Sequence, residues 1–91
     1  MKLTAKARQE FLADHPDWTV EGESISRTFQ FGDFTESVGF VVRVGFLAEA
    51  ADHHPDIDVR WSKVTLVLST HEEDALTEKD SHLAAAVDAL V

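Results

Sequence analysis

The chain has 91 residues, no cysteine, and a formal net charge of −9 from 17 acidic and 8 basic side chains. This length predicts a single domain spanning residues 1–91, and the lack of cysteine excludes disulfides and thiolate metal sites, so we expect so small a domain to gain burial as a homo-oligomer. The acidic charge argues against nucleic-acid binding, and the absence of an export signal or a long apolar run predicts a cytoplasmic protein with no membrane contact.

A first helix is predicted over residues 5–13. Thr4 can cap this helix, because a threonine side chain accepts hydrogen bonds from the first free backbone N–H groups. Pro16 disfavours helical backbone at the residue before it and so ends the segment.

Two strands are predicted next, a short one at residues 18–20 and a longer one at 25–31, joined by a turn at 21–24. Apolar and polar side chains alternate through most of the longer segment, which is the period of a half-buried strand. Arg27 falls on its apolar side and is an exception to the pattern.

A long helix is predicted over residues 34–51, where Asp33 and Glu36 have the spacing of a capping box. Its apolar side chains lie most of the way round, so the helix must be covered on more than one side. We expect one side to pack on the sheet and another to meet a second subunit, with Phe40 and Val44 as candidates for the subunit contact. Burial by the other helices of the same chain is the alternative.

The remaining residues predict a hairpin and a last helix. Alternating strands at 57–61 and 64–68 are joined by a tight turn at 62–63, and the helix begins near residue 77 after a loop at 72–76. The element order predicts an α+β fold in which helices cover one face of an antiparallel sheet. An exposed edge strand of this sheet would be protected by pairing with another subunit.

Side chains suited to chemistry are concentrated in two segments, Asp52-His53-His54-Pro55 and Ser69-Thr70-His71-Glu72. The first follows the long helix and the second follows a strand, and such loops are where binding groups usually collect. Histidine suits general acid–base catalysis because its unperturbed pKa, about 6.5, is near neutrality. Three imidazoles are therefore expected to converge at one opening.

Each of these residues also has a structural interpretation. His53 and His54 could cap the helix, Trp61 could belong to the core, and Asp80 could complement the dipole of the last helix. Ser69 and Thr70 could satisfy backbone groups at the strand end. A metal site is not expected, because adjacent histidines usually diverge and no metal-binding spacing is present.

These segments, with further motifs along nearly the whole chain, resemble the pterin-4a-carbinolamine dehydratase family. The further motifs are Phe29-Gln30-Phe31, Asp33-Phe34, Gly39-Phe40, Arg43-Val44, Trp61, Lys63-Val64 and residues 75–80. The resemblance implies a four-stranded antiparallel sheet with three helices on one face. It also implies a homodimer or homotetramer formed through the long helix and an edge strand.

The implied reaction is the dehydration of 4a-hydroxytetrahydropterin, such as 4a-hydroxytetrahydrobiopterin, to quinonoid dihydropterin and water. It would recycle the pterin used in aromatic amino acid hydroxylation. No cofactor is implied, because the pterin is itself the substrate. The leaving hydroxyl must gain a proton and a ring nitrogen must lose one.

The resemblance also implies roles for individual residues. His53, His54 and His71 would form the acid–base set, and Asp80 would support a histidine. Our own interpretation assigns His53 and His54 to protonating the leaving hydroxyl and His71 to the ring-nitrogen side. From helix spacing alone, Glu49, one helical turn before His53, could orient that ring or could equally be a solvated carboxylate. The residues implied in substrate binding are Asp52, Pro55, Trp61, Ser69, Thr70 and Glu72.

Two alternatives stay open. The first is a noncatalytic or regulatory protein-binding member of the same fold, although a pure scaffold needs no set of three histidines. The second is an enzyme that acts on a different pterin, such as one related to molybdopterin. Ile57 replaces an aromatic residue present in some family members, which indicates a change in packing.

Overall fold

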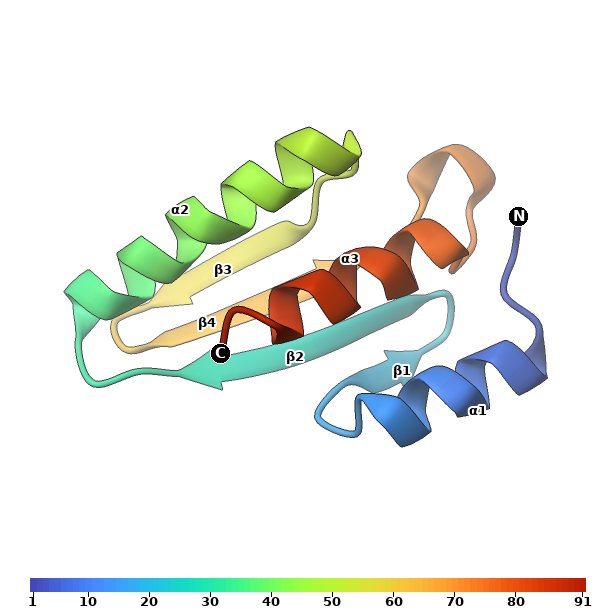
Figure 1. Ribbon diagram of the computed structural model, residues 1–91, viewed down its shortest axis with the longest axis horizontal. Coiled ribbons are helices and arrows are strands. Elements are labelled where there is room, and N and C mark those ends of the chain that lie inside the picture. Colours follow the sequence, from blue (N-terminus) through green and yellow to red (C-terminus); the bar gives the residue numbers. More distant parts are fainter.

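The computed structural model describes residues 1–91 as a four-stranded antiparallel sheet with α1, α2 and α3 all on one face (Figure 1). The elements, in chain order, are α1 (Ala5–Asp14), β1 (Thr19–Glu21), β2 (Ser24–Gln30), α2 (Phe34–Ala51), β3 (Asp56–Arg60), β4 (Lys63–Leu68), the 3₁₀ helix η1 (His71–Glu73) and α3 (Glu78–Asp88). This arrangement confirms the predicted α+β class. None of the helices is long and apolar enough to span a membrane.

Side-chain caps define where the helices begin. Thr4 accepts a hydrogen bond from the N–H of Ala7 at 3.0 Å. At the start of α2, Asp33 accepts from the N–H of Glu36 and the Glu36 carboxylate accepts from the N–H of Gly32, both at 2.8 Å. These reciprocal bonds satisfy donors that no helical carbonyl can reach, which explains the agreement between predicted and observed helix starts.

The strand order is β1-β2-β4-β3, so the two hairpins join through their inner strands. Phe29 of β2 lies opposite Val64 of β4, and Leu66 of β4 lies opposite Ile57 of β3. The covered face of the sheet packs against α2 and α3, and the fully buried side chains there include Phe40, Val44, Leu66 and Val87. β3 forms one edge of the sheet.

Arg27 is accommodated on the covered face by a carboxylate from the end of α3. Its Nη1 donates to Oδ1 of Asp88 at 2.7 Å, and its guanidinium carbon lies 4.3 Å from the ring centroid of Phe29. The indole N–H of Trp18 and a ring nitrogen of His15 also bond the Asp88 carboxylate, at 2.9 and 2.7 Å. The exception in the strand pattern is thus an ion pair that fastens β2 to α3.

The predicted roles of Phe40 and Val44 at a subunit contact are wrong. Both side chains are fully buried in the core of their own chain, on the side of α2 that faces the sheet. The apolar side chains that α2 leaves exposed are Phe34, Val38, Val42 and Phe46. An all-round apolar pattern does not identify the inward side, because several apolar rows compete for it.

The hairpin turn lies one residue earlier than predicted. Arg60 pairs with Lys63, so the turn is formed by Trp61 and Ser62 rather than by residues 62–63. Trp61 has φ 53°, a left-handed conformation that is uncommon for a bulky residue, and its side chain is exposed. The preceding alternation gave no sign of this conformation.

Candidate active site

A left-handed residue at the end of α2 sets the direction of the two adjacent histidines. Asp52 has φ 50° and its N–H bonds the carbonyl of Glu49 at 3.2 Å, while the N–H of His53 bonds the carbonyl of Ala48 at 3.1 Å. This pattern satisfies the last free carbonyls of the helix and turns the chain sharply. Aspartate tolerates the left-handed region better than most residues do. The side chains that follow therefore leave the helix in different directions.

His53 points into the protein. Its side chain is almost fully buried, and Nε2 lies 2.5 Å from Oδ1 of Asp80, in the first turn of α3. Asp80 is itself inaccessible to solvent. A buried carboxylate that pairs with one ring nitrogen fixes the orientation of the imidazole, as a positioned acid–base group requires.

The other oxygen of Asp80 is held by two threonines. Oδ2 accepts from the hydroxyl of Thr70 and from the backbone N–H of Thr77, each at 2.9 Å. The two hydroxyl oxygens are 2.6 Å apart, and both threonines are buried. The carboxylate is thereby held at both oxygens, by His53 at Oδ1 and by the two threonines at Oδ2. Thr77 is also the N-cap of α3.

His54 points outward and has a different partner. Its Nε2 lies 2.7 Å from Oε1 of Glu49, and both side chains are exposed. The predicted orientation of His53 by Glu49 is therefore wrong, because Glu49 contacts the other ring of the pair. The divergence of the two rings agrees with the expectation that adjacent histidines do not chelate one ion, and no cluster of three potential metal ligands is present.

His71 and Glu72 lie in η1, which begins three residues after the last residue of β4, and both are exposed. The pKa of the Glu72 carboxyl is held below its usual range, chiefly by its own backbone N–H and further by the charges of Lys79, His53 and His71. Thr70, which directly precedes η1, and His53, which follows α2, both bond Asp80 in the first turn of α3, so the three segments meet at this point.

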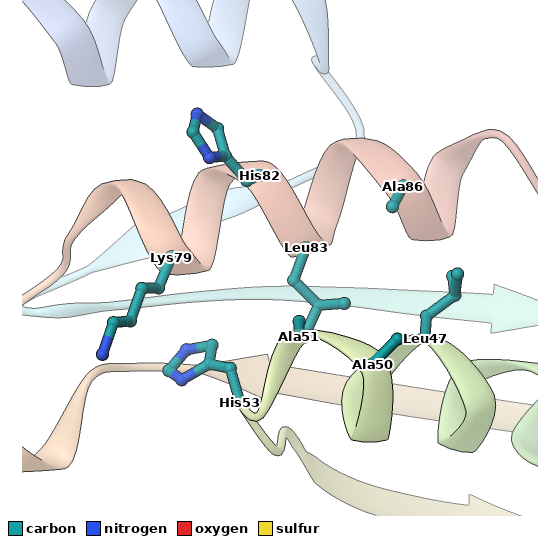
Figure 2. A pocket seen from close by; sticks show the side chains of 8 residues that line it. All are labelled: Leu47, Ala50, Ala51, His53, Lys79, His82, Leu83 and Ala86. Atoms are coloured by element: carbon teal, nitrogen blue, oxygen red, sulfur yellow. The ribbon is translucent and has the colours of Figure 1, made fainter.

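A groove of about 400 Å³ runs between α2 and α3 and ends at this cluster. Figure 2 shows His53 and Lys79 at one end of the groove, with the ring of His82 turned away from α2. The full lining is Leu47, Ala50, Ala51, His53, Lys79, His82, Leu83 and Ala86. An apolar groove of this volume with a few polar groups at one end is typical of a small-molecule site.

The predicted substrate-binding residues do not all lie near the groove. Asp52 and Glu72 are exposed beside the histidines, and Pro55 is half-buried. Ser69 donates its hydroxyl to the carbonyl of Glu23 at 2.7 Å. Trp61 follows the last residue of β3, whereas His53 and His54 precede its first residue, so the length of the strand separates Trp61 from this site.

Two residues that the sequence analysis did not assign lie at the site. Lys79 lines the groove, and Thr77 is part of the Asp80 network. Lys79 directly precedes Asp80 and Thr77 lies three residues before it, but their pattern is also that of an ordinary helix start. Only the fold shows that this helix start lies against His53.

Comparison with known proteins identifies the family of this chain. A family profile described as Pterin 4 alpha carbinolamine dehydratase matches residues 1–90. The chain belongs to this family. Proteins provisionally named pterin-4-alpha-carbinolamine dehydratase are 54% identical in Roseiflexus castenholzii, over 91% of this chain and 89% of that protein. In Chloroflexus aurantiacus the identity is 52%, over 99% of this chain and 97% of that protein.

Two solved structures have a similar fold. The transcriptional coactivator/pterin dehydratase from Brucella melitensis superposes with a TM-score of 0.93 and 33% identity, over 99% of this chain and 98% of that chain. A pterin dehydratase-like protein described as a RuBisCO assembly factor in the alpha-carboxysome gives a TM-score of 0.67 and 26% identity. This match covers 80% of this chain and 84% of the assembly-factor chain.

Proposed function

We propose that this chain dehydrates a 4a-hydroxytetrahydropterin of the biopterin type to quinonoid dihydropterin and water, by histidine general acid–base catalysis. The observation that supports this most directly is the buried His53–Asp80 pair at the end of a groove of substrate size. Thr70, which bonds the same aspartate, directly precedes His71 and Glu72 of η1. The family match supplies the substrate class. In this proposal the reaction recycles a pterin cofactor, and the pterin is the only non-protein reactant.

The chemistry asks little of the protein beyond proton transfer. The lone pair of a ring nitrogen expels the hydroxyl at C4a, so no nucleophile or electron sink is needed from a side chain. One proton leaves the ring nitrogen and another joins the departing hydroxyl. His53, His54 and His71 can perform such transfers near neutral pH, and polar groups of Asp52 and Glu72 can orient the pterin.

The deciding experiment is an ultraviolet assay of freshly generated 4a-hydroxytetrahydropterin, with the wild-type protein and with His53→Ala. We expect the wild type to accelerate dehydration and the variant to lose on the order of 10²-fold or more of that acceleration. His15→Ala is the matched control, because His15 also pairs with an aspartate, Asp88, which lies eight residues beyond Asp80 along α3. The folded control should retain kcat.

A folded wild-type protein that does not accelerate dehydration would contradict the proposal. It would favour another pterin as substrate or a noncatalytic protein-binding role. The fold shared with the RuBisCO assembly factor is the observation that favours the second of these.

The assembly state belongs to the same proposal. We propose a homodimer or homotetramer in which the exposed side of α2 and the free edge of β3 contact further copies. Phe34, Val42 and Phe46 are 53%, 54% and 74% exposed, and Ile57 and Val59 of β3 are 39% and 36% exposed. Large apolar side chains gathered on one helix and a neighbouring edge strand are typical of a subunit interface. We also propose a cytoplasmic location, which suits a chain without cysteine.

A further inference from the structure

The hydrogen bonds around Asp80 have a fixed direction. A backbone N–H can only donate, so Thr77 donates to Oδ2 of Asp80, and the Thr70 hydroxyl donates to the same oxygen. Asp80 also lies in the first turn of α3, where the helix dipole favours negative charge. These contacts present only donors to the carboxylate, and a carboxylate that carries no proton of its own only accepts.

The same reasoning assigns the donor and the acceptor in the contact between the two threonine hydroxyls. Thr70 has one hydroxyl proton and gives it to Asp80, so across the 2.6 Å contact Thr77 must donate to Thr70. The hydroxyl oxygen of Thr77 in turn accepts from the N–H of Lys79 at 3.2 Å. The result is a chain of donors, from Lys79 through Thr77 and Thr70, that ends on Asp80.

This chain determines which nitrogen of His53 carries the proton. Oδ1 of an ionised Asp80 can only accept, so Nε2 of His53, 2.5 Å away, donates to it. In the neutral imidazole the other nitrogen, Nδ1, then has the free lone pair.

Nδ1 of His53 is also accessible from the groove. It makes no hydrogen bond within the chain, and no fully buried side-chain nitrogen or oxygen in the protein lacks a partner. Nδ1 therefore reaches the surface, and the surface to which His53 contributes is the end of the α2–α3 groove (Figure 2).

We infer that Nδ1 of His53 is the atom that removes the ring-nitrogen proton of the pterin, and that Thr70 and Thr77 are positioning residues which set this tautomer through Asp80. The inference rests on the proposed dehydratase function. As Nδ1 takes the proton, the nitrogen lone pair forms a double bond to C4a and the C4a–O bond breaks. The hydroxyl leaves as water with a proton from His54 or His71, and Asp80 stabilises the imidazolium until the proton returns to solvent.

This division of roles reverses the one that we assigned to His53 from the sequence. It also changes the role of Thr70. The hydroxyl of Thr70 is buried and already donated, so it contributes to the reaction through Asp80 rather than by touching the substrate.

The first test needs no substrate. Nitrogen-15 chemical shifts of the His53 side chain distinguish a protonated from an unprotonated ring nitrogen in the free protein. We expect Nε2 to be protonated and Nδ1 to be unprotonated at a pH where the ring is neutral. The opposite tautomer would overturn the inference, whatever the protein's activity.

The second test compares Thr70→Val with Thr70→Ser. Valine keeps the shape of threonine but removes the donor to Asp80, so we expect a mixture of His53 tautomers. We also expect kcat to fall roughly ten- to a hundredfold, with little change in KM, as part of the contribution of a positioned base. Serine should restore both the tautomer and kcat.

A Thr70→Val protein with the wild-type tautomer and kcat would overturn the positioning role. A folded wild type with the expected tautomer but no dehydratase activity would instead overturn the role of Nδ1 in catalysis together with the proposed function. The tautomer assignment itself would then be supported, so the two failures are distinguishable.

Discussion

Neighbouring histidines in this chain have opposite surroundings, and the difference begins with a single residue. The left-handed backbone of Asp52 turns His53 inward toward Asp80 and leaves His54 in solvent with Glu49. A sequence that reads His-His therefore contains one ring with a buried hydrogen-bond partner and one ring whose partner is exposed. General acid–base catalysis can use both kinds of group, since one proton must be taken at a defined atom and the other can be supplied by a side chain in contact with solvent.

Asp80→Asn tests the fixed ring. The asparagine oxygen can still accept from Thr70 and Thr77, which directs its NH₂ group, a donor, at Nε2 of His53. The proton of the neutral ring then moves to Nδ1 and the groove loses its base. We expect kcat in the pterin assay to fall by about 10² or more, as when the aspartate of a histidine pair is replaced elsewhere.

Asp88→Asn is the matched control for that variant, because Asp88 also pairs with a histidine but lies eight residues beyond Asp80 along α3 and does not line the groove. The control should lose stability, since Arg27 and Trp18 share the same carboxylate, yet it should retain kcat. Equal losses of kcat in the two variants would show that the Asp80 effect is merely structural.

At the scale of elements, α1 is attached through charge as well as packing. Glu23, in the turn between β1 and β2, accepts two bonds from Nη2 of Arg8 at 2.7 and 2.9 Å. It also accepts from the N–H of Leu76 at 3.1 Å and lies 3.7 Å from the amine of Lys2. The Arg8 side chain, followed by the Leu76 N–H, holds the pKa of the Glu23 carboxyl below its usual range.

This attachment should weaken in acid. Because the pKa of Glu23 is lower in the folded protein than in the unfolded chain, its contribution is fully present above the unfolded pKa, near 4.5, and is lost as the pH falls through the lower folded value. We expect amide exchange in α1 to rise more steeply below pH 4.5 than exchange in β4. In Glu23→Gln the α1 exchange should already be raised at pH 7. An α1 exchange profile with the same acid dependence in both proteins would refute this.

The elements that the sequence predicted well are those with local signals. Asp33 and Glu36 define the start of α2 by their own hydrogen bonds, so its bounds were recoverable without the fold. The left-handed conformation of Trp61 could not be predicted from the sequence, because nothing near it in the sequence requires a positive φ. The burial of Phe40 and Val44 depends on the sheet beneath them, which a helical pattern alone does not locate.

The candidate site divides in the same way. The histidine segments and Asp80 stand out through the family resemblance, and the structure brings His53 and Asp80 into contact across 27 residues of sequence. The hydrogen bonds of Thr77 to Asp80 and Thr70 were not predictable, and neither was the pairing of His54 with Glu49, because both depend on side-chain directions. Trp61 was assigned to the site, but the length of β3 separates it from the histidines.

At the scale of the whole molecule, the chain leaves one apolar surface without cover. It combines the outer side of α2 with Ile57 and Val59 of the edge strand. A domain of this size buries only about 60–65% of the surface that its unfolded chain exposes, so covering this area with another copy is a substantial gain. The same contact would protect the unpaired backbone groups of β3.

Val42→Glu combined with Phe46→Glu tests the proposed assembly. Both side chains are exposed on α2, so the monomer fold should survive, while charge at the contact should prevent association. We expect light scattering coupled to size exclusion to give a dimer or tetramer mass for the wild type and a monomer mass for the variant. Arg43→Glu, an exposed charged residue on the same helix, should leave the mass unchanged. A monomeric wild type at micromolar concentration would contradict the assembly.

The left-handed backbone at Asp52 and Trp61 makes both positions candidates for substitutions that raise thermal stability. Glycine adopts such backbone without strain, so either position is one where a designer would normally place glycine or asparagine. The two positions differ in the side chain that a substitution by glycine or asparagine would remove. At Trp61 the exchange removes only an exposed indole, whereas at Asp52 it removes a carboxylate beside the catalytic candidates. The hairpin turn is therefore the place to raise the melting temperature, and the helix end is the place where greater stability would trade against turnover.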